Sequence, residues 1–345
     1  MVRCFETYCI DYVLNLKKPK SENTMRADKN FNTEIHKRFI IKMLKENYDQ
    51  EYESLAVWIP YWCISSLILL DSYRGGVCNI DFKSLEFKHL GDKILKCHKI
   101  YFSNKITPHL CNVYASICTL KMLNRLEEVK KDEIVKFMWN MKNEDGSFSV
   151  YETGDSDVRG IYCSLAISRM LTDINTTGLF LKSKEFILEC QSYEGGFGSI
   201  PGGEAHGGYT YCAVASLIMM NVLEECNIPL LIEWLSNRQK DFKGGFTGRT
   251  NKNQDSCYGF WIGACIKALI NLGKMNISQI NINSVKDYVF KECEDIKNGG
   301  FSDKPGNTPD CHHTCYTLLF LSIFDTENMF KVNVDHTLGL VEFIK

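Results

Sequence analysis

A helix–turn–helix unit repeats from Lys131 onward, and a glycine-rich turn marks its period. Each turn ends in phenylalanine, and successive phenylalanines are 49, 49 and 55 residues apart. Self-similarity at such a spacing is typical of repeat architectures, in which each unit buries its apolar face only by stacking on its neighbours. The four turns are Asp145-Gly146-Ser147-Phe148, Gly195-Gly196-Phe197, Gly244-Gly245-Phe246 and Gly299-Gly300-Phe301.

Two kinds of helix flank each turn. Before the turn, apolar residues recur at spacings of three and four, as in Ile134, Phe137, Met138 and Met141, which predicts a helix with one apolar stripe. After the turn, the segment is apolar on all sides, as in residues 209–220. A helix with one apolar stripe lies at a surface, whereas a helix that is apolar all round is buried. Each unit is therefore predicted to be an outer helix, a turn and an inner helix.

Two earlier segments repeat this order without the glycine-rich turn. Residues 39–48 lead to residues 61–70, and residues 92–97 lead to residues 110–120. Six such hairpins predict an all-α fold of two concentric helical rings, an α/α toroid whose turns converge at one mouth. Since no change in composition separates the units, residues 33–345 are predicted to form one domain. Residues 1–32 receive no assignment.

Composition narrows the class of protein. The chain has 40 basic and 42 acidic residues, a balance that argues against bulk binding to nucleic acid or membrane. Its 16 cysteines lie largely in apolar surroundings, and no secretory leader is evident, so we expect reduced thiols and a cytoplasmic location. The longest apolar runs, residues 57–70 and 209–222, are shorter than the ~20 residues that span a bilayer.

Three potential metal ligands occupy corresponding places in two units. Asp255 and Cys257 follow Phe246 by 9 and 11 residues, and His313 follows Phe301 by 12. A carboxylate, a thiolate and an imidazole together suit zinc, and three protein ligands leave a position open, as in catalytic sites. The alternative is a helix cap, a core cysteine and a hydrogen-bonded histidine. The neighbouring His312 competes for the metal in this pattern.

Cationic and hydroxyl side chains cluster ahead of consecutive inner helices. Helix N-termini bind anions, and His206, Arg249, Lys252 and Tyr258 would add donors suited to a phosphate or diphosphate. Arg159 either joins them or serves another substrate, and taken singly each could be a surface charge or a cap. The inner helices also carry many aromatics, which form either a packed core or the wall of a cavity for an isoprenoid chain.

At these residues the chain resembles the β subunits of protein prenyltransferases, and most specifically those of protein farnesyltransferases. Three long motifs carry the resemblance: residues 190–212, 238–261 and 299–316, with a weaker match at 52–71. The resemblance implies an α/α toroid paired with a helical-repeat α subunit, one bound zinc ion, and transfer of a prenyl group to a cysteine in a C-terminal CaaX sequence.

The resemblance also assigns residues. It implies that Asp255, Cys257 and His313 bind zinc and that Asp303 helps to place magnesium on the diphosphate. It implies that the lipid diphosphate contacts His206, Gly207, Gly208, Tyr209, Arg249, Lys252 and Tyr258. It implies a lipid and peptide pocket formed by Trp58, Trp62, Tyr114, Arg159, Tyr162, Cys212, Trp261 and His312.

Lipid length is the finer question. Related geranylgeranyl-transferring enzymes tend to have a smaller residue in place of Trp58 and lack the Asp303 carboxylate. The resemblance, together with the bulk of Trp58 and Tyr114, therefore implies farnesyl diphosphate rather than the longer geranylgeranyl diphosphate. His312 replaces a tyrosine of the family beside the last residues of the peptide. The alternatives are a type I or Rab geranylgeranyltransferase β subunit and a non-catalytic helical scaffold. A terpene cyclase would need an Asp-x-Asp-Asp acid, which residues 155–158 do not supply.

Overall fold

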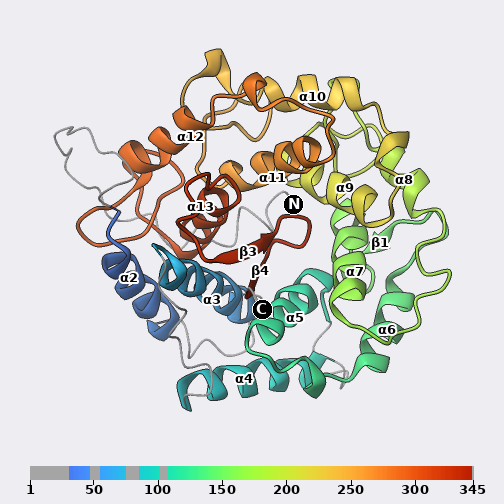
Figure 1. The fold of residues 1–345 in the computed structure, drawn as a ribbon. Coiled ribbons are helices and arrows are strands. Elements are labelled where there is room, and N and C mark those ends of the chain that lie inside the picture. Colours follow the sequence, from blue (N-terminus) through green and yellow to red (C-terminus); the bar gives the residue numbers. More distant parts are fainter. Residues whose placement is uncertain (1–30, 47–54, 75–84, 102–107, 344–345) are drawn as a thin grey trace.

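The computed structural model describes residues 31–46, 55–74, 85–101 and 108–343 and arranges their helices in two concentric rings (Figure 1). The outer ring consists of α2 (Thr33–Glu46), α4 (Leu85–Tyr101), α6 (Lys131–Met141), α8 (Ser183–Glu189), α10 (Ile228–Ser236) and α12 (Ile282–Tyr288). The inner ring consists of α3 (Leu55–Ser72), α5 (Leu110–Met122), α7 (Val158–Met170), α9 (Gly207–Met219), α11 (Tyr258–Asn271) and α13 (Cys311–Ile323).

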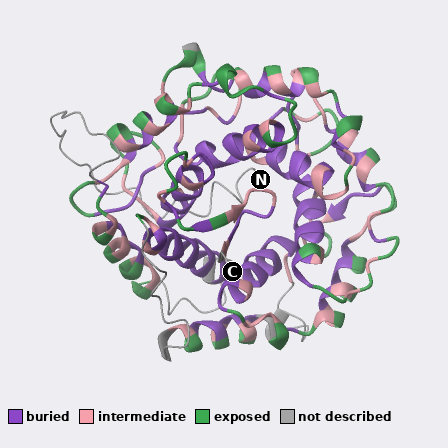
Figure 2. Cartoon of the chain, in the orientation of Figure 1, coloured by how far each residue is buried: buried purple, intermediate pink, exposed green. Residues whose placement is uncertain are grey.

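Consecutive inner helices pack against one another, and α13 packs against α3 to close the ring. The inner helices are buried, whereas the outer helices expose their outward faces (Figure 2). The stripe predicted on α6 is buried as expected, with Ile134 and Met138 fully inaccessible to solvent. The predicted α/α toroid is confirmed. Of the two early units, residues 47–48 and the turn at 102–107 lie outside the described residues, as do residues 1–30.

The glycine-rich turns let the units approach closely. All four turn phenylalanines are fully buried: Phe148, Phe197, Phe246 and Phe301. Gly195 has a φ of +102°, and a Cβ there would overlap the carbonyl oxygen of Leu230 on the next outer helix. The turn therefore needs glycine both for its left-handed backbone and for contact with the neighbouring unit.

Side-chain clamps join one unit to the next. The amide of Gln239 donates to the carbonyl oxygens of Gly244 (3.1 Å) and Asn281 (2.9 Å), and it accepts from the Asn281 N–H (2.9 Å). Asn281 precedes the next outer helix, so one side chain joins a turn to the start of the following unit. Gln191 binds Gly195 and Asn227 in the same way.

The last unit closes the ring with different chemistry. Glu294 occupies the position of Gln239 and pairs with His36 Nε2 of α2 at 3.1 Å. The Gly300 N–H donates to His36 Nδ1 at 2.8 Å, and the imidazole stacks on Phe301 with centroids 5.1 Å apart. The first outer helix is thus held to the last glycine-rich turn, which completes the toroid.

A β-hairpin that the sequence analysis did not predict occupies the centre of the inner ring (Figure 1). Strands β3 (Val332–Asp335) and β4 (Leu340–Phe343) pair antiparallel, with Val334 opposite Val341. The hydroxyl of Tyr61 donates to the Gly339 carbonyl and that of Tyr114 to the Leu338 carbonyl. A shorter pair, β1 (Phe148–Ser149) and β2 (Ser156–Asp157), lies beside α7.

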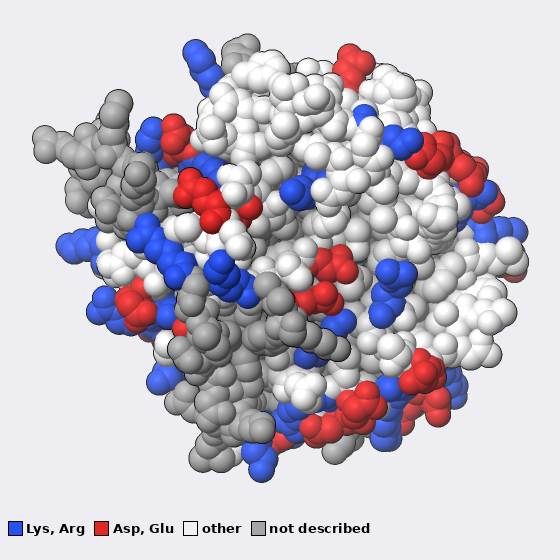
Figure 3. Space-filling view, in the orientation of Figure 1, with Lys and Arg blue, Asp and Glu red and all other residues white. Residues whose placement is uncertain are grey.

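The described part of the surface is mixed in charge. Basic and acidic side chains are interspersed on the face shown in Figure 3, without a large patch of one sign, as the balanced composition leads one to expect. Among the helices that the structure describes, none has the length and apolar character needed to cross a bilayer.

Candidate metal and diphosphate site

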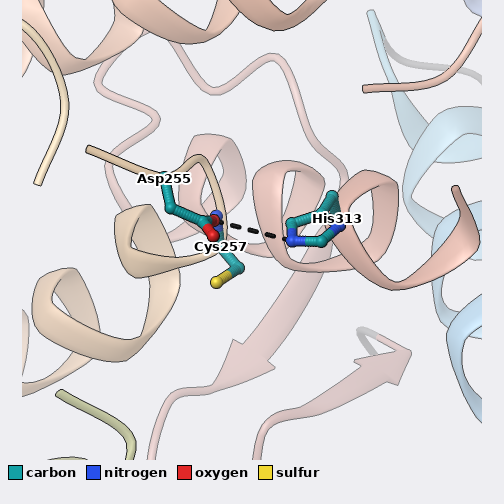
Figure 4. A group of neighbouring side chains, drawn as sticks. All are labelled: Asp255, Cys257 and His313. Atoms are coloured by element: carbon teal, nitrogen blue, oxygen red, sulfur yellow. Dashed lines mark hydrogen bonds and ion pairs between the residues drawn. The ribbon is translucent and has the colours of Figure 1, made fainter. Parts of the chain in front are cut away.

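The three predicted metal ligands come together at the start of two neighbouring inner helices. Asp255 and Cys257 immediately precede α11, and His313 lies in the first turn of α13. Their ligand atoms all lie within 4.8 Å of one another, and the three side chains point toward a common centre (Figure 4). Asp255 Oδ1 is 3.6 Å from His313 Nε2.

The loop that carries Asp255 and Cys257 is fixed from two sides. Within it, the Cys257 N–H donates to Asp255 Oδ1 at 2.8 Å. From the next unit, the Asp303 carbonyl accepts from the Ser256 N–H at 2.8 Å, and the Ser302 carbonyl accepts from the Ser256 hydroxyl at 2.7 Å. The last glycine-rich turn therefore positions the metal-binding loop of the unit before it.

Asp310 orients His313, and the sequence analysis missed it. Its Oδ1 accepts from the His313 N–H at 2.8 Å, as an N-cap does, and its Oδ2 lies 2.6 Å from His313 Nδ1. This contact leaves Nε2 directed at Asp255. An aspartate three residues before a candidate ligand, at the start of a predicted helix, was the signal that could have identified it.

The charges and burial of the three donors change one another's pKa values. Burial acts to lower the pKa of His313, but the carboxylates of Asp310 and Asp255 outweigh it and raise this pKa well above its usual value. Burial and the Asp255 carboxylate raise the pKa of the Cys257 thiol well above its usual value. Without a cation, the chain therefore holds a thiol and an imidazolium near neutral pH, and both must lose a proton to bind a metal.

The residues present fit a metal ion. Carboxylate oxygen, thiolate sulfur and imidazole Nε2 converge on one point, and the second imidazole nitrogen already has a carboxylate partner, which is the usual arrangement of a ligating histidine. A mixed oxygen, sulfur and nitrogen set is one that zinc accepts, and three protein ligands leave a fourth position for a substrate. Asp310, His312 and His313 form a second, overlapping group of ligand atoms.

Part of the predicted diphosphate set lies beside this centre. His206 caps α9, where the Gly208 N–H donates to its Nδ1 at 3.1 Å. The proton of a neutral His206 is therefore on Nε2, which lies 2.9 Å from the Tyr258 hydroxyl oxygen. Tyr258 accepts this hydrogen bond, so its own O–H points away from His206. Gly207 is tied by its N–H to the Gly248 carbonyl at 2.7 Å.

The other predicted cations are placed differently. Arg249 is half-buried and pairs with Glu204 at 3.0 Å. Lys252 is exposed and lines a surface groove that does not include the metal ligands. Arg159 is buried and bonded to Asp157, with its Nε 3.0 Å from Oδ1, and it lies over the Tyr209 ring. The Asp303 carboxylate contacts Asn307 (2.8 Å) and Lys304 (3.4 Å).

A pocket joins the metal centre to the His206–Tyr258 pair. It encloses about 30 Å³ and is lined by His206, Gly208, Cys212, Cys257, Tyr258, Trp261 and His312. All seven belong to the predicted site. The His312 ring packs edge-on against Trp62 and Tyr316, with centroids 5.1 Å and 4.8 Å away, so it forms part of the pocket wall beside His313.

The remaining predicted aromatics pack on one another around the inner ring. Trp58 stacks on Trp62 (5.5 Å) and donates through Nε1 to Asn112 (3.1 Å). Farther along, the hydroxyl of Tyr162 bridges those of Tyr114 (3.3 Å) and Tyr211 (3.2 Å). Tyr211 in turn contacts Trp261 of the pocket at 5.1 Å. A continuous aromatic layer therefore connects the pocket to the hairpin.

Comparison with known proteins agrees with this fold and site. The model of the prenyltransferase alpha-alpha toroid domain matches residues 31–340. The farnesyltransferase β subunit of Schizosaccharomyces pombe is 32% identical over 306 residues, 85% of this chain and 78% of that protein. The type 1 geranylgeranyl transferase β subunit of Arabidopsis thaliana is 37% identical over 240 residues, 64% and 60% of the two chains.

The solved structure of Candida albicans protein geranylgeranyltransferase-I complexed with GGPP superimposes with a TM-score of 0.74. It is 23% identical and covers 90% of this chain and 96% of its own, so it supports the fold. The chain therefore belongs to the prenyltransferase family with the α/α toroid fold, and within it to the β subunits of protein prenyltransferases.

Proposed function

We propose that the chain is the β subunit of a zinc-dependent protein farnesyltransferase, which transfers farnesyl from farnesyl diphosphate to the cysteine of a C-terminal CaaX sequence. One observation carries this proposal. A single pocket is lined both by Cys257 of the metal donor set and by the His206–Tyr258 pair at two helix N-termini. A thiolate site and an anion site so placed suit the transfer of a group from a diphosphate to sulfur.

Zinc held by Asp255, Cys257 and His313 would supply the positive charge that keeps the substrate cysteine as a thiolate near neutral pH. The thiol proton is released to solvent. The sulfur then forms a bond to C1 of the isoprenoid while the bond from C1 to the diphosphate oxygen breaks, and that electron pair leaves with the diphosphate.

The chain's own residues would stabilise the negative charge of the departing diphosphate. The hydrogen bond from His206 Nε2 aims the Tyr258 O–H away from His206, and we assign this O–H to a diphosphate oxygen. The N-terminus of α9 at Gly207 and Gly208 adds the positive end of a helix dipole. Arg249 and Lys252 complete the set once Arg249 exchanges Glu204 for the diphosphate.

Farnesyl is the lipid that the pocket favours. Trp58, Tyr114 and Tyr162 crowd the inner ring below the pocket, which leaves little length for a longer chain. Asp303 is the proposed magnesium residue, since magnesium prefers carboxylate and phosphate oxygens. We further propose that an α subunit completes a heterodimer, that His312 contacts the peptide, that residues 33–345 form one domain, and that the enzyme is cytoplasmic.

The second candidate is a geranylgeranyltransferase β subunit, because the Arabidopsis relative is 37% identical. The two are separated by co-expressing the chain with a prenyltransferase α subunit and letting farnesyl and geranylgeranyl diphosphate compete for a CaaX peptide ending in Met or Ser. A farnesyl product supports the proposal, and a geranylgeranyl product overturns the lipid assignment. Bound zinc in an intact complex without transfer to any peptide would favour a scaffold.

A further inference from the structure

A second group of potential metal ligands overlaps the first at the start of α13. In the part of the chain that the structure describes, Asp310, His312 and His313 each place one ligand atom within 4.8 Å of the other two. The sequence pattern predicts His312 only as a competitor for the zinc ion. The structure gives it a carboxylate and a second imidazole as neighbours, so these three donors form a set of their own.

The two groups share His313 but lie at different atoms of its ring. Nε2 faces the first group, 3.6 Å from Asp255 Oδ1 (Figure 4). Nδ1 faces the second group, 2.6 Å from Asp310 Oδ2. The His312 ring lies edge-on to the His313 ring, with centroids 4.6 Å apart. His313 therefore stands between two groups of donors.

A cation can reach the second group. The Asp310 side chain is 23% exposed and that of His313 is 12% exposed, and His312 lines the pocket beside Cys257. Asp310 is fixed as the N-cap of α13, and the His312 ring is held by its edge-on aromatic contacts in the pocket wall. The donors are therefore positioned by the fold and partly open to solvent.

The second group differs from the first in the chemistry of its donors. It offers one carboxylate and two imidazoles, whereas the first includes the thiolate of Cys257. A soft thiolate ligand favours zinc, while two histidines with one carboxylate are typical of sites for ions such as Fe²⁺. Ni²⁺ also binds well to nitrogen and oxygen donors. The type of metal ion should therefore select between the two groups.

The two groups compete for one ligand. A neutral imidazole has one nitrogen with a free lone pair and one nitrogen that carries a proton. When Nε2 of His313 binds an ion of the first group, the proton is on Nδ1 and faces Asp310. When Nδ1 binds an ion of the second group, the proton is on Nε2 and faces Asp255. A neutral His313 can therefore complete only one group at a time.

We propose that Asp310, His312 and His313 form a second metal site, for a divalent cation that prefers nitrogen and oxygen donors, and that this cation competes with zinc for His313. An ion in this site leaves zinc with only Asp255 and Cys257, so in the proposed enzyme it would slow prenyl transfer. The inference goes beyond the proposed function and does not depend on it, since it concerns only which ions the two groups bind.

The test uses Ni²⁺ as the probe, added to the whole chain after a chelator has removed its metal. Wild type should bind nickel without the absorption band of a nickel–thiolate bond, and zinc should displace the nickel. His312→Phe keeps an aromatic ring in the pocket wall but removes the imidazole donor. We expect it to lower nickel affinity at least about tenfold and to leave zinc affinity unchanged. His89→Phe, at an exposed histidine of α4, is the matched control and should bind both ions as wild type does.

Cys257→Ala should give the converse result. It removes a ligand of the first group only, so the chain should no longer retain zinc but should bind nickel with wild-type affinity. This variant also tests the proposal if His312→Phe folds poorly. Four results would each overturn the proposal: no nickel binding by wild type, a nickel–thiolate band in wild type, loss of nickel in Cys257→Ala, or equal nickel affinity in folded His312→Phe and wild type.

These measurements are separate from the test of the proposed function. A chain that binds nickel through His312 and transfers no prenyl group supports the second site and contradicts the function. A chain that transfers farnesyl but binds nickel through Cys257 supports the function and contradicts the second site.

Discussion

Two regions of the inner ring solve opposite problems. At the mouth, where the inner helices begin, Asp255, Cys257 and His313 converge on one point. The hairpin enters from the opposite end, where Phe330 pairs with Tyr73 at the end of α3, and its tip reaches hydroxyls from the first two turns of α3 and α5. Polar groups around the hairpin tip are satisfied by the chain, whereas those at the mouth are arranged for a ligand.

Equivalent positions of the repeat therefore carry polar groups of two kinds, those that stabilise the fold and those that can bind a ligand. The tyrosines around the hairpin tip form a closed network, and burial raises the pKa of Tyr61 and Tyr114 well above the usual value, so they stay neutral. At the mouth, opposed charges perturb every donor. Groups with perturbed pKa values in a pocket are typical of functional sites. Variants in the two regions should therefore affect different quantities.

The largest effect is expected from Cys257→Ala. It removes the thiolate ligand, so we expect zinc to be lost and prenyl transfer to fall at least about a hundredfold, because even indirect supports of a metal site are worth ten- to a hundredfold. Metal analysis, transfer assays and circular dichroism of the complex test this. Helicity should be unchanged, and normal transfer by this variant would refute the ligand assignment.

Zinc affinity should fall as pH falls. The raised pKa values of Cys257 and His313 mean that both groups are protonated in the metal-free chain near neutral pH, and zinc displaces both protons. Lowering the pH adds competing protons, so affinity should drop by up to about a hundredfold per pH unit. Calorimetry in buffers with different heats of ionisation counts the protons, and a count of zero contradicts the assigned ligands.

Asp310→Asn tests the group that orients His313. The amide can keep a hydrogen bond to the His313 N–H but loses the negative charge at Nδ1, which weakens the basicity of Nε2. We expect zinc affinity to fall about ten- to a hundredfold and to recover at higher zinc concentration. Asp325→Asn, at a carboxylate that only accepts backbone N–H groups near the chain's end, is the control and should leave affinity unchanged.

The smallest effects are expected at the hairpin tip. Gly339→Ala would place a Cβ 3.2 Å from the hydroxyls of both Tyr61 and Tyr114, at a φ of +60°. The left-handed backbone alone costs roughly 1–2 kcal/mol of stability, and the displaced tyrosines should shift lipid preference toward geranyl diphosphate. Zinc affinity should not change. Asn333→Ala, on the exposed side of β3, is the control, and equal lipid preference in the two variants would contradict a role for these tyrosines in limiting lipid length.

Much of the fold could be predicted from sequence because the pattern of an outer helix followed by an inner helix recurs in six units. The outer stripes, the buried inner helices and the glycine turns each follow from local periodicity, and all were confirmed. The hairpin was missed although residues 332–343 alternate with period two. A single short alternation is a weak signal in a sequence whose other segments predict helices. Its place in the centre depends on hydroxyls more than 200 residues away in sequence.

In the candidate site, too, some features could be predicted from the sequence and others could not. The metal donors were predictable because repeat-equivalent positions of neighbouring units lie at the same level of a toroid, and the structure brought them together. Lys252 was predicted to contact the diphosphate and Arg159 to line the lipid and peptide pocket; in the structure Arg159 pairs with Asp157, and Lys252 lines a surface groove that does not include the metal ligands. Side chains this long reach several directions from one backbone position, so their partners do not follow from spacing.

By itself, then, the sequence determined the toroid, the donors at its mouth and the family to which the chain belongs, since periodicity and contiguous motifs are local properties. Tertiary structure decided the partner of each charge: Asp310 for His313, Glu294 for His36, and Asp157 for Arg159. Ion pairs form between whichever groups the fold brings within a few ångströms, and that distance exists only once the ring has closed.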